Sequence, residues 1–94
     1  MALLTQAQHR EQLREAFLRT LAAAPAISYG VEELARRARG SHAVDAPFDE
    51  TDALDALALL QGLDLVKPVR RPLSGLNDWQ ITAEGILFTE KNYG

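Results

Sequence analysis

The chain has 94 residues, which suits one domain spanning 1–94 and allows a hydrophobic core without covalent cross-links. It contains no cysteine, which excludes disulfides, a thiolate nucleophile and cysteine metal ligands, and a reducing cytoplasm is the expected location. The apolar run near the start is too short for a secretory signal or a membrane span, so neither export nor insertion is expected.

The formal net charge of −3 hides a sorted distribution of charge along the chain. Segment 31–39 holds three arginines, segment 40–66 holds six acidic residues and no Lys or Arg, and segment 67–77 holds three cations without an acid. An anionic partner would therefore meet two basic segments separated by an acidic one.

The first helix is predicted to begin with a capping-box pattern of Thr5 and Gln8 and to end at Pro25. Its apolar residues recur at helical spacing and predict one buried face: Leu13, Ala16, Phe17, Leu21 and Ala24. A short extended connection follows over 26–28, before Tyr29 and Gly30.

The second helix is predicted over 31–39, and Gly40 supplies its stop. Acids in its first turn and arginines in its last turn match the helix dipole. We expect a buried stripe of Val31, Leu34, Ala35 and Ala38. The arginines should then lie outside or on the flanks of the helix: Arg36, Arg37 and Arg39.

The third helix is predicted over 50–61, with Asp49 as N-cap and Gly62 at the first position past its end. The inward residues are expected to be Leu54, Leu57, Ala58 and Leu60. The opposite face is expected to carry Asp52, Asp55, Ala56 and Leu59.

The last third of the chain predicts a two-stranded ribbon, over 63–73 and 79–82, around a turn at 74–78. Trp79 and Ile81 share a strand face and are expected to pack on the core. Thr82 can then cap a short helix over 83–91, whose apolar residues include Ile86, Leu87 and Phe88.

This order of elements resembles the winged helix-turn-helix superfamily. Segment 56–66 looks like the third helix of that superfamily running into the first wing strand, and the exit Ile81-Thr82-Ala83-Glu84-Gly85 is similar to the close of the wing in MarR-like and PadR-like bacterial regulators. The resemblance implies an α+β, mostly helical fold: a three-helix body, a two- or three-stranded β wing and a short C-terminal helix.

The resemblance also implies a small DNA-binding module of a bacterial or phage transcription regulator, whose third helix enters the major groove while the wing touches phosphates. The third helix departs from that pattern, because Asp49, Glu50, Asp52 and Asp55 stand where base-reading residues are expected. The wing and second helix therefore supply the expected contacts to DNA: Arg36, Arg37, Arg39, Lys67, Arg70, Arg71, Ser74 and Asn77.

The alternative is a protein-interaction module on the same scaffold, either an adaptor or a homodimer. Its support is the acidic third helix and a sequence pI near 5.3, which is low for a stand-alone DNA binder. The residues expected at such an interface are Asp52, Asp55, Ala56, Leu59, Ile86, Leu87 and Phe88.

No enzymatic constellation is predicted. Ser41, His42 and Asp45 are close in sequence, but a lone histidine in a polar loop is usually an exposed loop residue, and His9 is interpreted in the same way. The acids at 45–55 do not follow the spacing of a calcium loop, and no metal or cofactor is expected. Tyr29 stays open as a platform on which bases could stack.

Overall fold

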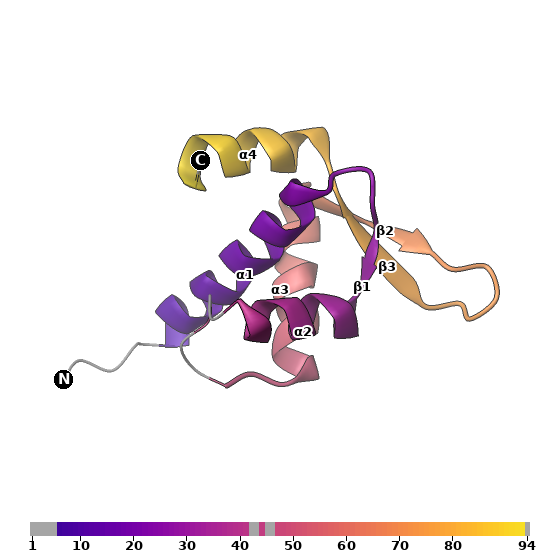
Figure 1. The fold of residues 1–94 in the computed structure, drawn as a ribbon, viewed down its shortest axis with the longest axis horizontal. Coiled ribbons are helices and arrows are strands. Elements are labelled where there is room, and N and C mark those ends of the chain that lie inside the picture. Colours follow the sequence, from indigo (N-terminus) through magenta and orange to yellow (C-terminus); the bar gives the residue numbers. More distant parts are fainter. Residues whose placement is uncertain (1–5, 42–43, 45–46, 94) are drawn as a thin grey trace.

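A computed structural model describes residues 6–41, 44 and 47–93. Their order confirms the mostly helical α+β fold of a winged helix, with a C-terminal helix after the wing (Figure 1). The elements are α1 (Gln6–Ala23), β1 (Tyr29–Gly30), α2 (Val31–Gly40), α3 (Glu50–Gly62), β2 (Val66–Arg70), β3 (Asn77–Ile81) and α4 (Ala83–Tyr93). Thr5, His42 and Asp45 lie outside the described residues.

The strands form an antiparallel three-stranded sheet with the order β1-β3-β2. Trp79, in the middle of β3, pairs with Tyr29 of β1 on one side and with Pro68 of β2 on the other. The β2–β3 hairpin extends beyond the helices as a projecting arm, which we call the wing (residues 66–81), with its tip at residues 71–76 (Figure 1).

The core lies where α1 contacts α2, α3 and α4. Phe17 of α1 is fully buried and meets the ring of Phe48 edge to face, with 6.4 Å between the ring centroids. Trp79 and Ile81 are buried, as their shared strand face predicts. Among the described residues, no helix combines the length and apolar character that a membrane span requires.

Helix α3 begins as predicted but is rotated about its axis relative to the expected face. Asp49 caps it in a capping box with Asp52, through bonds of 2.9 and 3.1 Å. The inward residues are Ala53, Ala56, Leu57 and Leu60, which recur at helical spacing.

Two predictions for the inward face of α3 are therefore wrong, since Leu54 is 44% exposed and Ala58 is exposed. The prediction that Ala56 faces outward is also wrong, because it is buried. The buried stripe contacts α1 and α2, which leaves Leu54 and Leu59 on the outer side of the helix.

The end of α3 also differs from the prediction. Gly62 is the last helical residue, and the left-handed position is taken by Asp64, whose φ is 60°. The Asp64 carbonyl accepts a hydrogen bond of 2.6 Å from the Thr82 hydroxyl, which ties the start of β2 to the start of α4. Aspartate visits this backbone region more readily than most residues, so no glycine is required there.

Helix α4 begins at the predicted cap and ends two residues beyond the predicted limit, at Tyr93 instead of Lys91. The Thr82 hydroxyl accepts a hydrogen bond of 3.0 Å from the backbone N–H of Gly85. A Cβ atom at Gly85 would collide with the backbone carbonyl of Leu65. Glycine at this position therefore lets α4 lie directly on the chain entering β2, at the base of the wing.

Replacing Gly62 with alanine tests where α3 ends. Gly62 has ordinary helical backbone and open space around its Cα, so Gly62→Ala should stabilise the fold by about 0.5 kcal/mol. Thermal unfolding should then show a midpoint about 2–4 °C higher. A lower midpoint would mean that Gly62 holds the left-handed position.

Candidate nucleic-acid interface

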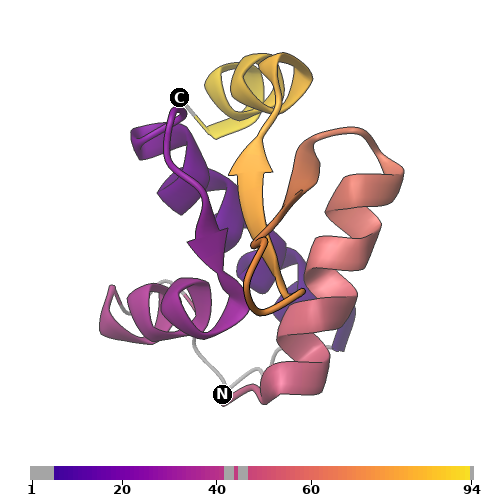
Figure 2. The ribbon, with the colours of Figure 1, turned by 90° about the vertical axis from the view of Figure 1, so that its right-hand side faces the viewer.

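The wing presents its cations on two faces. Arg70 lies opposite Asn77 in the ladder and shares the face of buried Trp79, which borders α3. Side chains alternate along a strand, so Lys67 lies on the other face, with Gln80 opposite it. Figure 2, which looks toward the wing, shows the hairpin projecting between α2 and α3. Lys67 and Arg70 are both exposed.

One wing cation is paired, which corrects the expectation that all three are unopposed. The Arg71 guanidinium donates through Nε to the Asp78 carboxylate at 2.6 Å and lies across Gly30 of β1. Within the described part of the chain, neither Lys67 nor Arg70 has an ion pair. The free positive charge of the wing is therefore carried by those two residues.

The wing tip combines small polar groups with bare leucines. The Ser74 hydroxyl accepts a hydrogen bond of 3.2 Å from the Leu76 N–H, and Gly75 takes a positive φ of 71°. Leu73 is fully exposed, at 101%, and Leu76 is 62% exposed. Ser74 and Asn77 are exposed beside them, so the tip offers neutral donors next to unburied apolar surface.

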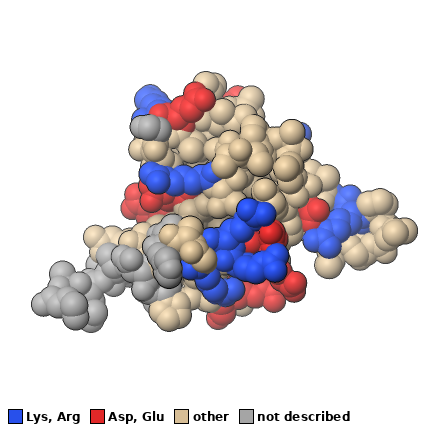
Figure 3. All heavy atoms as spheres, in the orientation of Figure 1, with Lys and Arg blue, Asp and Glu red and all other residues tan. Residues whose placement is uncertain are grey.

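The arginines of α2 lie at the surface as predicted, but carboxylates and aromatic rings engage them. Arg36 and Arg37 share the Glu33 carboxylate, and their side chains remain 78% and 50% exposed. Arg39 donates to the Phe48 carbonyl at 3.0 Å and lies over the ring of that residue. In Figure 3, basic side chains gather over α2 and near the base of the wing, with acidic ones beside both.

The ring of Tyr29 already contacts other residues of the same chain. It is half-buried, it packs against the core, and the Arg37 guanidinium lies 4.8 Å from the centre of its ring. An arginine over the face of an aromatic ring stabilises the ring position by a cation–π interaction. Stacking of a base on that ring face would displace Arg37.

The outward face of α3 is acidic and apolar. Asp49 and Asp52 are used in the capping box, while Glu50 and Asp55 are exposed without an ion pair among the described residues. Leu59 is 40% exposed, as predicted. Ala56, expected at a protein interface, is buried and cannot contribute to one directly.

Helix α4 leaves apolar surface uncovered. Ile86 is half-buried against the core, whereas Leu87 is 65% and Phe88 is 37% exposed. Phe88 meets the ring of Tyr93 edge to face, and Arg19 of α1 lies over that same ring. Burial raises the pKa of the Tyr93 hydroxyl, and the nearby carboxylates of α1 add to the effect. Leu87 is the apolar side chain of α4 most open to a partner.

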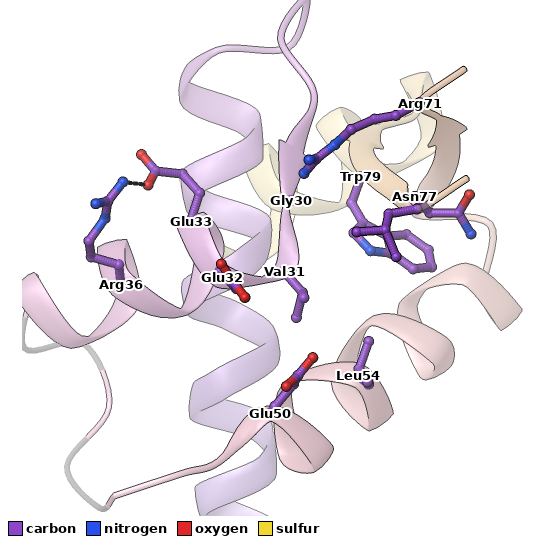
Figure 4. A pocket seen from close by; sticks show the side chains of 11 residues that line it. Gly30, Val31, Glu32, Glu33, Arg36, Glu50, Leu54, Arg71, Asn77 and Trp79 are labelled. Atoms are coloured by element: carbon purple, nitrogen blue, oxygen red, sulfur yellow. Dashed lines mark hydrogen bonds and ion pairs between the residues drawn. The ribbon is translucent and has the colours of Figure 1, made fainter. Parts of the chain in front are cut away.

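A cleft of about 700 Å³, which sequence reasoning did not find, lies between α2, α3 and the tip half of the wing, where Arg71, Leu76 and Asn77 line it. Figure 4 shows Leu54 and Trp79 on one side of it and the start of α2 on the other, with the carboxylates of Glu32 and Glu50 between the two helices. The two carboxylates also line a second, smaller hollow together. We call the larger of the two, the cleft of about 700 Å³, the α2–α3–wing cleft; no single segment encodes it.

The described residues contain no cluster of three or more metal-ligating side chains of the His, Cys, Asp or Glu type. The Ser41 hydroxyl donates to the Ala38 carbonyl at 3.0 Å, so it serves the end of α2.

No protein-family model and no curated protein matches the sequence. Among solved structures, the chain is similar to a transcriptional regulator from Clostridium thermocellum, Cth-833, with a TM-score of 0.75 and 18% identity over 95% of this chain and 84% of that one. It is also similar to ZitR of Lactococcus lactis, in a C30AH42A mutant, with a TM-score of 0.67 and 19% identity over 90% of this chain and 57% of that one.

At such identities the comparisons show the fold alone, which is a winged helix. The chain spans little more than half the length of ZitR. The narrower resemblance to MarR-like or PadR-like proteins stays a prediction.

Proposed function

We propose that the chain is a non-enzymatic DNA-binding module of a transcription regulator that holds the phosphate backbone mainly with its wing. The supporting observation is that Lys67 and Arg70 are exposed on a projecting hairpin without an ion pair among the described residues. Asn77, opposite Arg70, and Ser74 at the tip add neutral donors that suit phosphate oxygens.

The placement of Lys67 and Arg70 suits contact with the two phosphate backbones that border the minor groove of DNA. Lys67 and Arg70 lie on opposite faces of one ribbon. A hairpin laid along the minor groove, which is about 6 Å wide, has one phosphate backbone on each side. In this arrangement each cation reaches a different strand, and the contacts carry little information about base sequence.

Helix α3 contributes little to this binding. The carboxylates of Glu50 and Asp55 would approach phosphates without a compensating cation, so deep insertion into the major groove is unfavourable. Helix α2 makes a weaker contact with the phosphates than the wing does, because Glu33 neutralises one of the two positive charges of Arg36 and Arg37. Arg39 is held by Phe48 and contributes less.

Salt titration of duplex binding, measured by fluorescence anisotropy, tests the proposal. Each phosphate neutralised by the wing adds about −0.9 to the slope of log affinity against log salt. We therefore expect Lys67→Ala and Arg70→Ala each to weaken binding to unrelated duplexes alike, and each to reduce the slope by about 0.9.

Lys91→Ala is the matched control, because Lys91 is an exposed cation on α4. Its affinity and salt slope should equal those of the unmodified chain. Failure of the unmodified chain to bind duplex DNA at about 50 mM salt would contradict the proposal. Equal losses for all three variants would show attraction by overall charge instead of a wing contact.

Asp78→Asn tests the role of the paired arginine. Removing the carboxylate frees Arg71, whose guanidinium lies across Gly30, and adds one unopposed positive charge. Duplex binding should become severalfold tighter, with the salt slope steeper by up to about 0.9. An unchanged slope in the same anisotropy assay would mean that Arg71 does not reach the phosphates.

A protein-interaction module is the second candidate function. The observation in its favour is the uncovered apolar surface of Leu87 and Phe88 on α4. Exposed apolar patches commonly mark interaction sites. If α4 were the interface, Leu87→Asp would abolish self-association while the fold remained intact, a result that sedimentation would detect.

A further inference from the structure

We propose that two copies of the chain associate by exchanging wing tips, so that Leu73 of each copy enters the α2–α3–wing cleft of the other. This inference goes beyond the proposed DNA contact and does not depend on it. It commits to a second copy as the occupant, because the wing tip and the cleft of this chain are complementary in both charge and polarity.

The cleft has open apolar surface and acidic side chains without an ion pair among the described residues. Leu54, which is 44% exposed, and Leu76, which is 62% exposed, leave apolar surface open along its walls. Glu32 and Glu50 come from the first turns of α2 and α3 and face the same space (Figure 4). Neither has an ion pair among the described residues, so the cleft favours a cation attached to an apolar group.

Glu33 and Arg71 also line the cleft, but each is already neutralised. Glu33 carries two arginines of its own helix, and Arg71 is bound to Asp78. Arg36 lines the cleft as well and shares Glu33 with Arg37, so the lining holds three acids against two arginines, and Glu32 and Glu50 are its acids without an ion pair among the described residues.

The wing tip carries an apolar side chain close to a cation, which is the combination that the cleft favours. Leu73 is fully exposed at the turn of the hairpin. Arg70, three residues before it, is exposed and has no ion pair among the described residues. A tip inserted into the cleft would bury Leu73 against Leu54 and would bring Arg70 to the carboxylates.

Two copies can make this contact reciprocally, related by a two-fold axis. The cleft lies beside the tip half of the same hairpin whose turn is the insert, since Arg71, Leu76 and Asn77 line it. Two wings laid antiparallel and side by side at their tip halves bring each turn to the cleft of the other copy. Such an isologous contact forms a closed dimer and not a fibre.

The exchanged contact is small, so the dimer should be weak and dependent on concentration. It also uses Arg70, which the proposed DNA contact requires. Self-association and duplex binding should therefore compete, with DNA favouring the monomer. A regulator built in this way would release its wings on dilution or on contact with DNA.

Sedimentation equilibrium of the full chain without nucleic acid, from micromolar to near-millimolar concentration, tests the exchange. The unmodified chain should show a monomer–dimer equilibrium. Leu73→Asp should raise the dissociation constant by about tenfold or more, since a fully exposed side chain can be changed without loss of the fold. Leu87→Asp, the same replacement on α4, is the matched control and should leave the equilibrium unchanged.

A charge exchange identifies the partner surfaces. Arg70→Glu and Glu50→Arg should each weaken the dimer by about tenfold, and the chain carrying both changes should regain most of the affinity. Circular dichroism confirms that each variant is folded. A monomer at every concentration, loss of the dimer through Leu87→Asp with no effect of Leu73→Asp, or no recovery in the double variant would each overturn the proposal.

Failure of this experiment would leave the DNA proposal intact, because the salt titration is performed with dilute protein. Conversely, a chain that dimerises as described but binds no duplex would retain the wing exchange and lose the DNA contact.

Discussion

The central position of strand β3 is the constraint on which every candidate surface of this protein depends. It pairs with β1, which leads into α2, and with β2, which follows α3, so one strand connects the helical body to the wing. Trp79 and Ile81 fix it to the core, while Asn77 and Asp78 extend outward along the hairpin. If β3 were lost, the wing and the cleft beside it would disappear together.

The basic segments of the sequence do not all become free positive charge on the surface of the folded protein. Arg36 and Arg37 share one carboxylate, and Arg71 is paired across the hairpin, so two carboxylates compensate two of these three positive charges. Exposed pairs of this kind contribute little to stability, but they remove free charge from the surface. Lys67 and Arg70 remain, which concentrates the attraction for an anion on the wing.

Much of the fold could be predicted from the sequence because its signals are local. Asp49 and Thr82 cap the helices as predicted, and the alternation around Trp79 identifies the core face of β3. The face of α3 could not be predicted, because leucine and alanine occur on every side of that helix. Packing against α1 and α2 selects the alanines, which leaves Leu54 outside.

The candidate site was predictable only in part. The basic residues of the wing are visible in the sequence, but the pairing of Arg71 with Asp78 depends on the hairpin register and on the passage over Gly30. The α2–α3–wing cleft brings together three separated segments, whose contacts no periodicity encodes. The carboxylates of Glu32 and Glu50 are ordinary first-turn acids in sequence and become neighbours only in the fold.

Amide correlation spectra of the isotope-labelled chain, titrated with a short DNA duplex at low salt, test most directly whether the wing meets the nucleic acid. If the wing holds the duplex, the largest shifts should occur at Lys67, Arg70 and Asn77, with small changes along α3. Larger shifts at Asp55 and Ala58 than on the wing would contradict it, because they would place α3 against the duplex.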